Sequence, residues 1–223
     1  MSVHLLTGAG SGIGRCLADL LHERGDELVL VARSEERAAD LAERYAGAAT
    51  LVADLAEPLP DLALPDRLDT VVHCAGVVDV AHVGDADPGA VEAQVRVNLL
   101  APAELTRRCL PALRAARGLV VFVNSTSGLV ANPGWAGYAA SKFGLRGYAD
   151  ALRAEEASYG VRVTSVFPSR TATPMQELVH EREGRNYDAG DWMSPETVAQ
   201  AVVGVIDLPR DATTTDLTLR THH

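Results

Sequence analysis

The sequence contains few aromatic residues, few cysteines and no long apolar segment. Aromatic residues make up 4% of its 223 residues, and its three cysteines form no C-x-x-C pair. Isolated cysteines argue against a disulfide-stabilised secreted fold and are typical of free thiols in a reducing compartment. No apolar run approaches the roughly 20 residues of a membrane-spanning helix, and no basic segment precedes the first strand-like residues, as a signal peptide would require. We therefore expect a cytoplasmic protein that does not cross a membrane.

Positive charge is also scarce. The chain has 20 lysines and arginines against 30 aspartates and glutamates, which gives a net charge of −10. This balance argues against nucleic acid or an anionic membrane surface as the main partner. His82 and His180 have no further ligands at a metal-binding spacing, so we expect no metal site. What remains is an acidic protein whose partner is a small molecule.

Apolar strand-like segments alternate with helical segments along the whole chain. Strands are expected at 3–6, 28–32, 50–53, 70–74, 119–124, 162–167 and 217–220. Helices are expected at 13–24, 35–45, 88–116 with an interruption near Asn98 and Pro102, 138–159 and 195–206. Three prolines in residues 56–66 predict an irregular crossover there. This alternation predicts a single α/β domain over residues 1–223, with a Rossmann-type doubly wound parallel sheet of about seven strands covered by helices on both faces.

A glycine-rich turn separates the first strand from the first helix. Gly8, Gly10, Gly12 and Gly14 allow the backbone to turn sharply and to approach a pyrophosphate at the N-terminus of the helix. The spacing is G-x-x-x-G-x-G, because Ile13 occupies the last glycine position of the G-x-G-x-x-G fingerprint. The turn indicates a dinucleotide site, with a tight loop that binds nothing as the alternative.

The residue after the second strand predicts the cofactor preference. In a sheet of this kind that position faces the adenine ribose, and here it is Arg33. A carboxylate would bind the ribose hydroxyls of NAD, whereas a guanidinium accommodates the 2′-phosphate of NADP. We therefore predict that NADP(H) is preferred over NAD(H), with charge added by Arg15; for Arg33 a solvated helix start is the alternative. Asp54, followed by Leu55, is placed to contact the adenine or serves only as a loop residue.

Three residues have the spacing of a proton-transfer site. Tyr138 precedes Lys142 by four residues, on the same helix face, and Ser125 lies thirteen residues before the tyrosine. A tyrosine titrates at about pH 10, and a nearby ammonium favours its ionised form. Tyr138 would exchange a proton with an alcohol or carbonyl oxygen that Ser125 holds, with Ser127 as a rival for that role. Lys142 is the only lysine in the chain, which suggests a site that needs a compact ammonium, with chance survival in an arginine-biased chain as the alternative.

Seven motifs follow one another along nearly the whole chain: Thr7-Gly-x-x-x-Gly12-x-Gly14, Asp54, Ala75-Gly76, Asn98, Ser125, Tyr138-x-x-x-Lys142 and Pro168…Thr173. In this order they resemble the short-chain dehydrogenase/reductase family. The resemblance implies that Asn98, Ser125, Tyr138 and Lys142 are catalytic, that Lys142 also binds the nicotinamide ribose, and that Asn98 steadies a water in a proton relay. The cofactor contacts expected are Gly8, Gly10, Ser11, Gly12, Ile13, Gly14, Arg15, Arg33, Asp54, Leu55, Ala75, Gly76, Asn98, Tyr138, Lys142, Pro168, Thr171 and Thr173.

The chain departs from the family pattern in two places. Where the family usually has Asn-Asn before Ala-Gly, this chain has His73-Cys74, and where the family usually has Pro-Gly it has Pro168-Ser169. We expect His73 at the end of its strand, with its ring satisfied by backbone. Both departures bear on the cofactor pose and leave the predicted fold unchanged.

The segments that follow the strands are expected to bind the substrate. Residues 77–84, 129–135 and 175–193 offer mainly apolar side chains, which predicts an uncharged or weakly polar, mainly apolar carbonyl or alcohol, with ordinary core packing of these side chains as the alternative. Arg170 is unusual at this edge and either reads an anionic substrate or forms a surface ion pair. The family usually associates through the helices after the fourth and fifth strands, which implies a homodimer or homotetramer built on about 90–115 and 138–159.

The leading prediction is an NADP(H)-dependent oxidoreductase that interconverts a carbonyl and a secondary alcohol. An NAD(H)-preferring member of the same family is one alternative. A dinucleotide-binding redox sensor without turnover is another, although a sensor has no need of the Ser/Tyr/Lys/Asn set. A sugar-nucleotide epimerase or dehydratase would need a longer C-terminal substrate domain than 223 residues provide.

Overall fold

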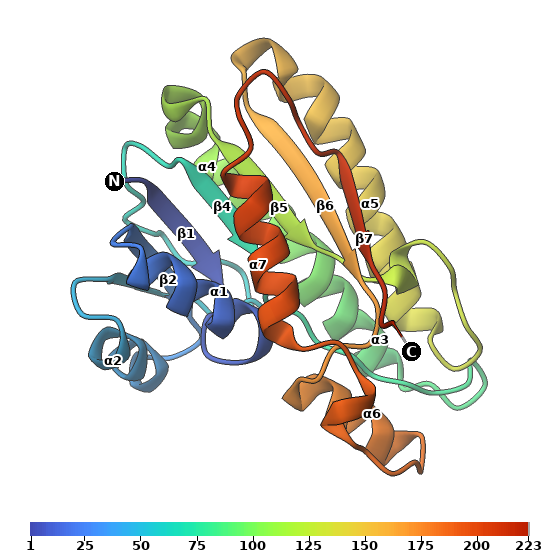
Figure 1. Ribbon diagram of the computed structural model, residues 1–223. Helices are drawn as coiled ribbons and strands as arrows, with labels where there is room; N and C mark the ends of the chain where they lie inside the picture. The colour runs from blue at the N-terminus through green and yellow to red at the C-terminus, as the bar shows by residue number, and fades with distance from the viewer. Residues whose placement is uncertain (223) are drawn as a thin grey trace.

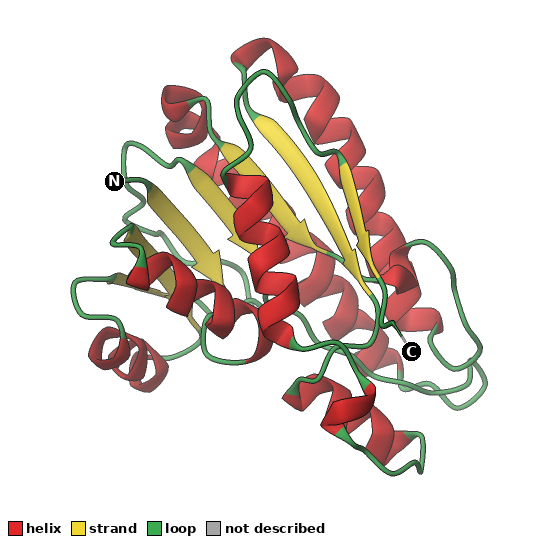
Figure 2. Ribbon diagram, viewed as in Figure 1, coloured by secondary structure: helices red, strands yellow, loops and turns green. Residues whose placement is uncertain are grey.

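The computed structural model describes residues 1–222, and within them seven strands form one parallel sheet in the order β3-β2-β1-β4-β5-β6-β7. Figure 2 shows that the strand arrows run toward the same edge of the sheet. The predicted doubly wound fold is confirmed. The strands are β1 (Val3–Thr7), β2 (Glu27–Ala32), β3 (Ala49–Val52), β4 (Thr70–His73), β5 (Leu119–Val123), β6 (Arg162–Pro168) and β7 (Asp216–Leu219).

Helices cover both faces of the sheet. One face carries α1 (Gly12–Glu23), α2 (Glu35–Arg44) and α7 (Pro195–Ile206), and Figure 1 shows α1 and α7 side by side in front of the strands. The opposite face carries α3 (Pro88–Val95), α4 (Ala101–Ala116) and α5 (Ala136–Glu156). The short α6 (Pro174–Arg182) lies beyond the carboxyl ends of the strands.

The strands are apolar on both faces because each face has its own core. Successive side chains of a strand point to opposite sides, so neighbours in sequence join different clusters. Leu6, Val72 and Val121 pack with α1 and α7, whereas Leu5 and Val71 belong to the cluster on the α4 and α5 side. All five are fully buried. A strand whose residues are all apolar therefore indicates a sheet with helices packed on both of its faces.

The crossover between β3 and β4 contains no helix, as its prolines predicted. Its leucines, among them Leu59 and Leu68, pack into the α4 side of the core. Arg108 of α4 holds the segment by donating to the backbone carbonyl of Leu59 at 2.9 Å. A loop thus takes the place of a crossover helix between β3 and β4, and its leucines shield the α4 side of the sheet from solvent.

The predicted interruption near Asn98 is a π-helical segment, η1 (Arg96–Leu100), between α3 and α4. The helix α6 was not predicted as a helix, although Thr173-Pro174 is a typical start: the Thr173 side chain accepts from the backbone N–H of Gln176 at 3.3 Å. Among residues 1–222, no helix combines the length and apolar character needed to cross a membrane.

The strand order reverses direction between β1 and β4. From β1 the chain moves to β2 and β3 on one side, and after β4 it moves to β5, β6 and β7 on the other. The connections at the carboxyl ends of β1 and β4 therefore separate and leave a crevice there, which is where ligands bind in sheets of this type.

Candidate active site

Two adjoining cavities occupy the crevice at the carboxyl ends of the strands. The smaller has a volume of about 440 Å³ and the larger about 1010 Å³. Gly8, Ser11, Ala75 and Gly76 line both, so the two form one groove across the switch point. The larger cavity extends toward the end of β2 and the smaller toward β5, β6 and α6. A groove of this shape suits an elongated ligand with chemically different ends.

The glycine-rich turn is required by backbone packing at two positions. Gly8 has φ +75, and a Cβ there would lie 2.7 Å from the backbone nitrogen of Ala75. A Cβ at Gly14 would lie 2.3 Å from the Gly8 carbonyl oxygen. The turn brings the N-terminus of α1 against the groove, where Ser11 makes no side-chain cap hydrogen bond and the first turn holds no acidic residue. These free N–H groups and the helix dipole fit the pyrophosphate of a dinucleotide.

The larger cavity is lined by the predicted adenosine contacts Arg15, Arg33, Asp54 and Leu55. Arg15 lies 3.9 Å from Asp19, whereas Arg33 forms no ion pair within residues 1–222. The Asp54 carboxylate accepts from the backbone N–H of Ala56 at 2.9 Å, so it also serves its loop. The guanidinium charge of Arg33 is therefore available to pair with a charged group of a ligand.

The predicted proton-transfer residues meet in the smaller cavity. Ser125, Tyr138 and Lys142 all line it, and so does the rival Ser127. The Ser125 hydroxyl accepts from the backbone N–H of Ser127 at 3.1 Å, which leaves its own hydrogen free to donate. Burial raises the pKa of Tyr138 to about 12, and a hydrogen bond with Ser125 acts in the opposite direction. Ser125 is therefore better placed than Ser127 to act with the tyrosine.

Lys142 is held beneath this pair. Its side chain is 3% exposed, and Nζ donates to the backbone carbonyl of Val123 at 3.1 Å. Nζ lies 5.7 Å from the centre of the Tyr138 ring. Burial lowers the pKa of Lys142 to about 8. The ammonium is thus fixed one helical turn from the phenol, and its charge is sensitive to mildly alkaline pH.

Asn124 was not singled out from the sequence, yet it connects the site residues. Its Oδ1 accepts from the backbone N–H of Ser125 at 2.9 Å, and its Nδ2 donates to the Lys142 carbonyl at 3.1 Å. Asn124 is 3% exposed and lines the smaller cavity. An asparagine directly before Ser125, at the end of a buried strand, was the signal in the sequence. It is a positioning residue that ties β5 to α5.

Asn98 lies one layer behind the cavities and lines neither. Its Oδ1 accepts from the backbone N–H of Val77 at 2.9 Å, while its Nδ2 donates to the Val77 carbonyl at 2.9 Å and to the Ser141 hydroxyl at 3.0 Å. A Cβ added to Gly76 would lie 3.2 Å from Asn98 Oδ1. The Asn98 side chain therefore braces the loop after β4 from behind.

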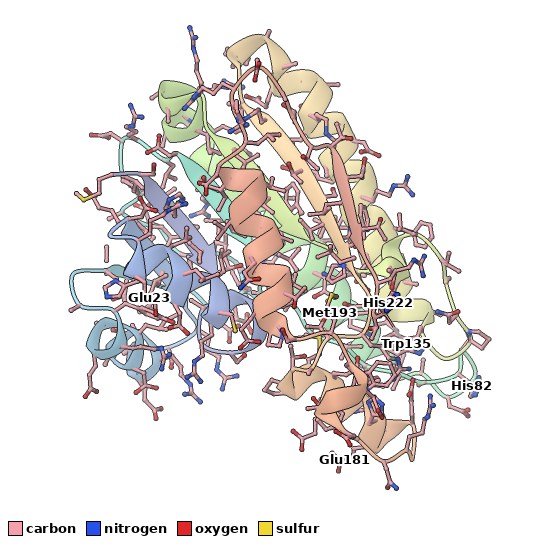
Figure 3. The ribbon with its side chains drawn as sticks, in the orientation of Figure 1. Glu23, His82, Trp135, Glu181, Met193 and His222 are labelled. Atoms are coloured by element: carbon pink, nitrogen blue, oxygen red, sulfur yellow. The ribbon has the colours of Figure 1, made fainter. Side chains whose placement is uncertain are left out.

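The segment after β6 closes the smaller cavity. Thr171 and Thr173 line it together with Pro168, the last residue of β6, and all three are residues for which the sequence suggested a cofactor contact. Thr171 forms an isolated bridge with Met193, and Figure 3 shows Met193 and Trp135 near the edge of the sheet above α6. Ser169, which replaces the glycine usual in the family, accepts from the backbone N–H of Thr221 at 3.0 Å. This departure thus anchors the C-terminal segment.

The prediction that backbone groups satisfy the His73 ring was wrong. Its Nε2 instead forms a hydrogen bond with the Thr106 hydroxyl at 2.8 Å, and its ring stacks on Phe122 with centroids 5.0 Å apart. Nδ1 is buried and has no hydrogen-bond partner within the described residues. Burial lowers the pKa of His73 to about 3, so the ring is held neutral. Cys74 lines the smaller cavity, and burial raises its thiol pKa to about 12.

We predict that His73→Asn makes the protein less sensitive to acid. Below its ordinary pKa of 6.5, His73 gains a proton when the chain unfolds but not while it is folded, so stability falls with pH down to about 3. Between pH 7 and pH 5 this one residue costs about 2 kcal/mol. Urea unfolding at the two pH values should show the smaller loss in the variant. The exposed His82→Asn should behave like the wild type, and equal losses in all three proteins would contradict the prediction.

Comparisons with known proteins agree with this geometry. The family model described as "short chain dehydrogenase" matches residues 2–184. Dehydrogenase/reductase SDR family member 7B of Xenopus laevis is 30% identical over 92% of this chain and 71% of its own length.

Two solved structures are similar over nearly the full chain. A short chain dehydrogenase from Escherichia coli CFT073 complexed with NADPH has a TM-score of 0.84 at 26% identity, covering 97% of this chain and 95% of its own. A 4-hydroxyisoleucine dehydrogenase complexed with NADH has a TM-score of 0.83 at 21% identity, covering 99% and 97%. The second shows likeness of fold alone.

Proposed function

The chain belongs to the short-chain dehydrogenase/reductase family of oxidoreductases, which act on CH–OH groups with NAD(P), and from this premise we propose that it interconverts a carbonyl and a secondary alcohol with NADP(H) as its preferred cofactor. The observation that carries the proposal is that Ser125, Tyr138 and Lys142 line the cavity that adjoins the glycine-rich turn. A proton donor and a dinucleotide cradle thus share one groove.

Each residue has a distinct task in the proposed reaction. The nicotinamide ring, when bound, supplies or accepts the hydride. Tyr138 gives a proton to the carbonyl oxygen during reduction and takes it back during oxidation. Ser125 donates a hydrogen bond to the same oxygen and stabilises its developing charge. Lys142 favours the phenolate form of Tyr138 by its charge and holds the nicotinamide ribose.

The groove also suggests roles for the remaining residues that the sequence analysis named. The cofactor contacts proposed are the residues predicted from the sequence that line the groove, which excludes Asn98 from that set: Gly8, Gly10, Ser11, Gly12, Ile13, Gly14, Arg15, Arg33, Asp54, Leu55, Ala75, Gly76, Tyr138, Lys142, Pro168, Thr171 and Thr173. Asn98 and Asn124 hold the loops that carry them. Residues 1–223 act as one domain in this proposal, since β7 completes the same sheet as the strands that line the groove.

A spectrophotometric panel tests the proposed activity. The purified protein would be mixed with NADPH or NADH and a set of ketones and aldehydes, and the loss of reduced-cofactor absorbance would be followed. We expect reduction of carbonyls with an apolar body, because Val78, Met175 and Val179 line the smaller cavity. Binding of both cofactors without turnover of any carbonyl or alcohol would favour a redox sensor instead.

We predict that NADPH is used in preference to NADH and that Arg33→Asp reverses the preference. A charge-assisted contact with the 2′-phosphate is worth about 1.5–3 kcal/mol, or roughly ten- to hundredfold in kcat/KM. In the variant, a carboxylate repels the phosphate and accepts from the ribose hydroxyls. The ratio of kcat/KM for the two cofactors measures the effect.

The control for this prediction is Arg107→Asp. Arg107 is exposed on α4 and lines neither cavity, so the same change of charge should leave the cofactor ratio unaltered. Equal or better use of NADH by the unmutated protein would show that Arg33 does not read the phosphate.

We predict a homodimer or homotetramer assembled through α4 and α5. The exposed fraction is 42% for Phe143 of α5 and 46% for Leu100, which directly precedes α4. Two large apolar side chains left in water on neighbouring helices favour burial against a second copy. Light scattering should give at least twice the mass of one chain, and Phe143→Glu should lower it. A monomer at micromolar concentration would refute the assembly.

A further inference from the structure

Arg170 occupies an unusual environment between β6 and α6. Its guanidinium carbon lies 5.6 Å from the Trp135 ring and 5.4 Å from the Trp192 ring. Nη2 donates to both carboxylate oxygens of Glu183, at 2.6 and 2.9 Å. The ion pair expected as one alternative from the sequence therefore exists, and the side chain is held firmly by it.

The ion pair does not satisfy the whole guanidinium. Nη1 of Arg170 is buried and has no hydrogen-bond partner within residues 1–222. A buried charged donor without an acceptor is costly, and buried polar groups in folded proteins usually have a protein or water partner. Arg170 lines the smaller cavity together with Ser125 and Tyr138. Nη1 itself has almost no accessible surface in this conformation, whereas the Arg170 side chain is 26% exposed, so an acceptor in the cavity satisfies Nη1 when the guanidinium turns toward it.

The charges around the smaller cavity favour an anion. Within residues 1–222, its charged lining residues are Lys142 and Arg170 and no acidic residue lines it, although the chain carries a net charge of −10. Glu183 is shared by Arg170 and by Arg185, at 3.6 Å, so this cluster keeps one net positive charge. Burial alone would raise the pKa of Glu183, but its hydrogen bond with Arg170 and the charges of both guanidinium groups lower the pKa further than burial raises it, which keeps the carboxylate ionised.

Trp135 lies close both to the cation and to the reacting end of the cavity. Its ring contacts Tyr138 edge-on, with centroids 5.7 Å apart, and it also packs against Arg170. The remaining walls include Val78, Met175 and Val179. The cavity thus combines a proton donor, apolar walls and a guanidinium that has an unpaired donor. A ligand with a carbonyl, a short hydrocarbon body and an anionic group matches all three.

We propose that Arg170 is a substrate-binding residue that receives a carboxylate, so that the substrates are oxo acids and hydroxy acids with an apolar body. A planar carboxylate accepts well from the edge of a guanidinium, and it fits a cavity of about 440 Å³ that also receives the nicotinamide end. The inference rests on the proposed carbonyl–alcohol activity and specifies its substrate. The carboxylate takes no part in the reaction, which reduces the carbonyl.

Kinetics with a matched pair of ketones test this assignment. The probes are 5-oxohexanoate and its methyl ester, which differ in the charge of one end. The wild type should reduce the acid with a kcat/KM about ten- to hundredfold above that of the ester. Arg170→Met should abolish this advantage by raising KM for the acid, while the ester changes less than about threefold. Equal use of acid and ester by the wild type would overturn the proposal.

Two further variants guard against a loop that merely misfolds. Glu183→Gln removes the carboxylate that competes for Arg170, so KM for the acid should fall. Arg182→Met breaks the ion pair of α6 with Asp79, but Arg182 does not line the cavity, so the ratio of acid to ester should stay as in the wild type. An equal loss of the acid preference in Arg182→Met and Arg170→Met would assign the effect to loop order and contradict the proposal.

Tryptophan fluorescence measures binding without turnover. The chain has two tryptophans, Trp135 and Trp192, and both lie against Arg170. Titration with 5-oxohexanoate should change this fluorescence in the wild type and not in Arg170→Met, with or without NADP⁺. A response through Arg170 with no reduction of any ketone would leave the carboxylate site standing and refute the proposed activity. Reduction of ketones with no carboxylate response, or an equal response to inorganic phosphate, would refute the carboxylate site alone.

Discussion

Tyr138→Phe is expected to lower kcat by about 10²–10⁴, the usual contribution of a positioned general acid or base. The substitution removes the hydroxyl that exchanges the proton and keeps the ring that packs edge-on against Trp135. The turn at Gly8–Gly14 lies on a different element, so the affinity for NADPH should change little. Steady-state rates and a cofactor titration on the same preparation separate the two effects.

Tyr148→Phe is the matched control for this prediction. Tyr148 lies on the same helix, α5, and its hydroxyl donates to the Ala103 carbonyl at 3.2 Å, outside both cavities. Its loss should leave kcat near the wild-type value. Wild-type turnover by Tyr138→Phe would remove the tyrosine from the reaction. It would also remove the main argument against a sensor, because the proton donor would then have no task.

The fold and the groove could be predicted from the sequence because both depend on local patterns of residues. Continuous apolar strands such as Leu119–Val123 predict a sheet covered on both faces, and the glycines of the first turn occur where side chains would collide with backbone. Tyr138 and Lys142 share a helix, so their proximity follows from the spacing alone. Each of these inferences needs only a few neighbouring residues.

Features that depend on contacts between distant segments were not accessible in the same way. Thr106, the partner of His73, lies 33 residues further along the chain, and no local pattern connects the two. The clamp of Arg170 between Trp135 and Trp192 joins three segments that only the folded chain brings together. Asn124 was passed over because its two backbone partners become visible only once β5 and α5 are in place.

Lys142→Met is expected both to weaken NADPH binding and to slow the reaction. The methionine fills similar space without the ammonium. Loss of a charge-assisted hydrogen bond to the ribose costs about 1.5–3 kcal/mol, roughly ten- to hundredfold in Kd. Tyr138 loses the charge that favours its phenolate, so kcat falls as well. Tyr138→Phe should affect the rate alone, and the two variants therefore separate proton transfer from cofactor binding.

The pH profile gives the sharper test of Lys142. Because kcat/KM for NADPH reports ionisation in the cofactor-free protein, and because burial lowers the pKa of Lys142 to about 8, this parameter should fall as pH rises through that value. Above it the amine is neutral and no longer supports either the ribose or the phenolate. Lys142→Met lacks this titrating amine in the site, so its low kcat/KM should stay flat between pH 7 and pH 9. A wild-type profile with no alkaline fall, or a fall that persists in Lys142→Met, would assign that ionisation to another group and leave Lys142 without the double role.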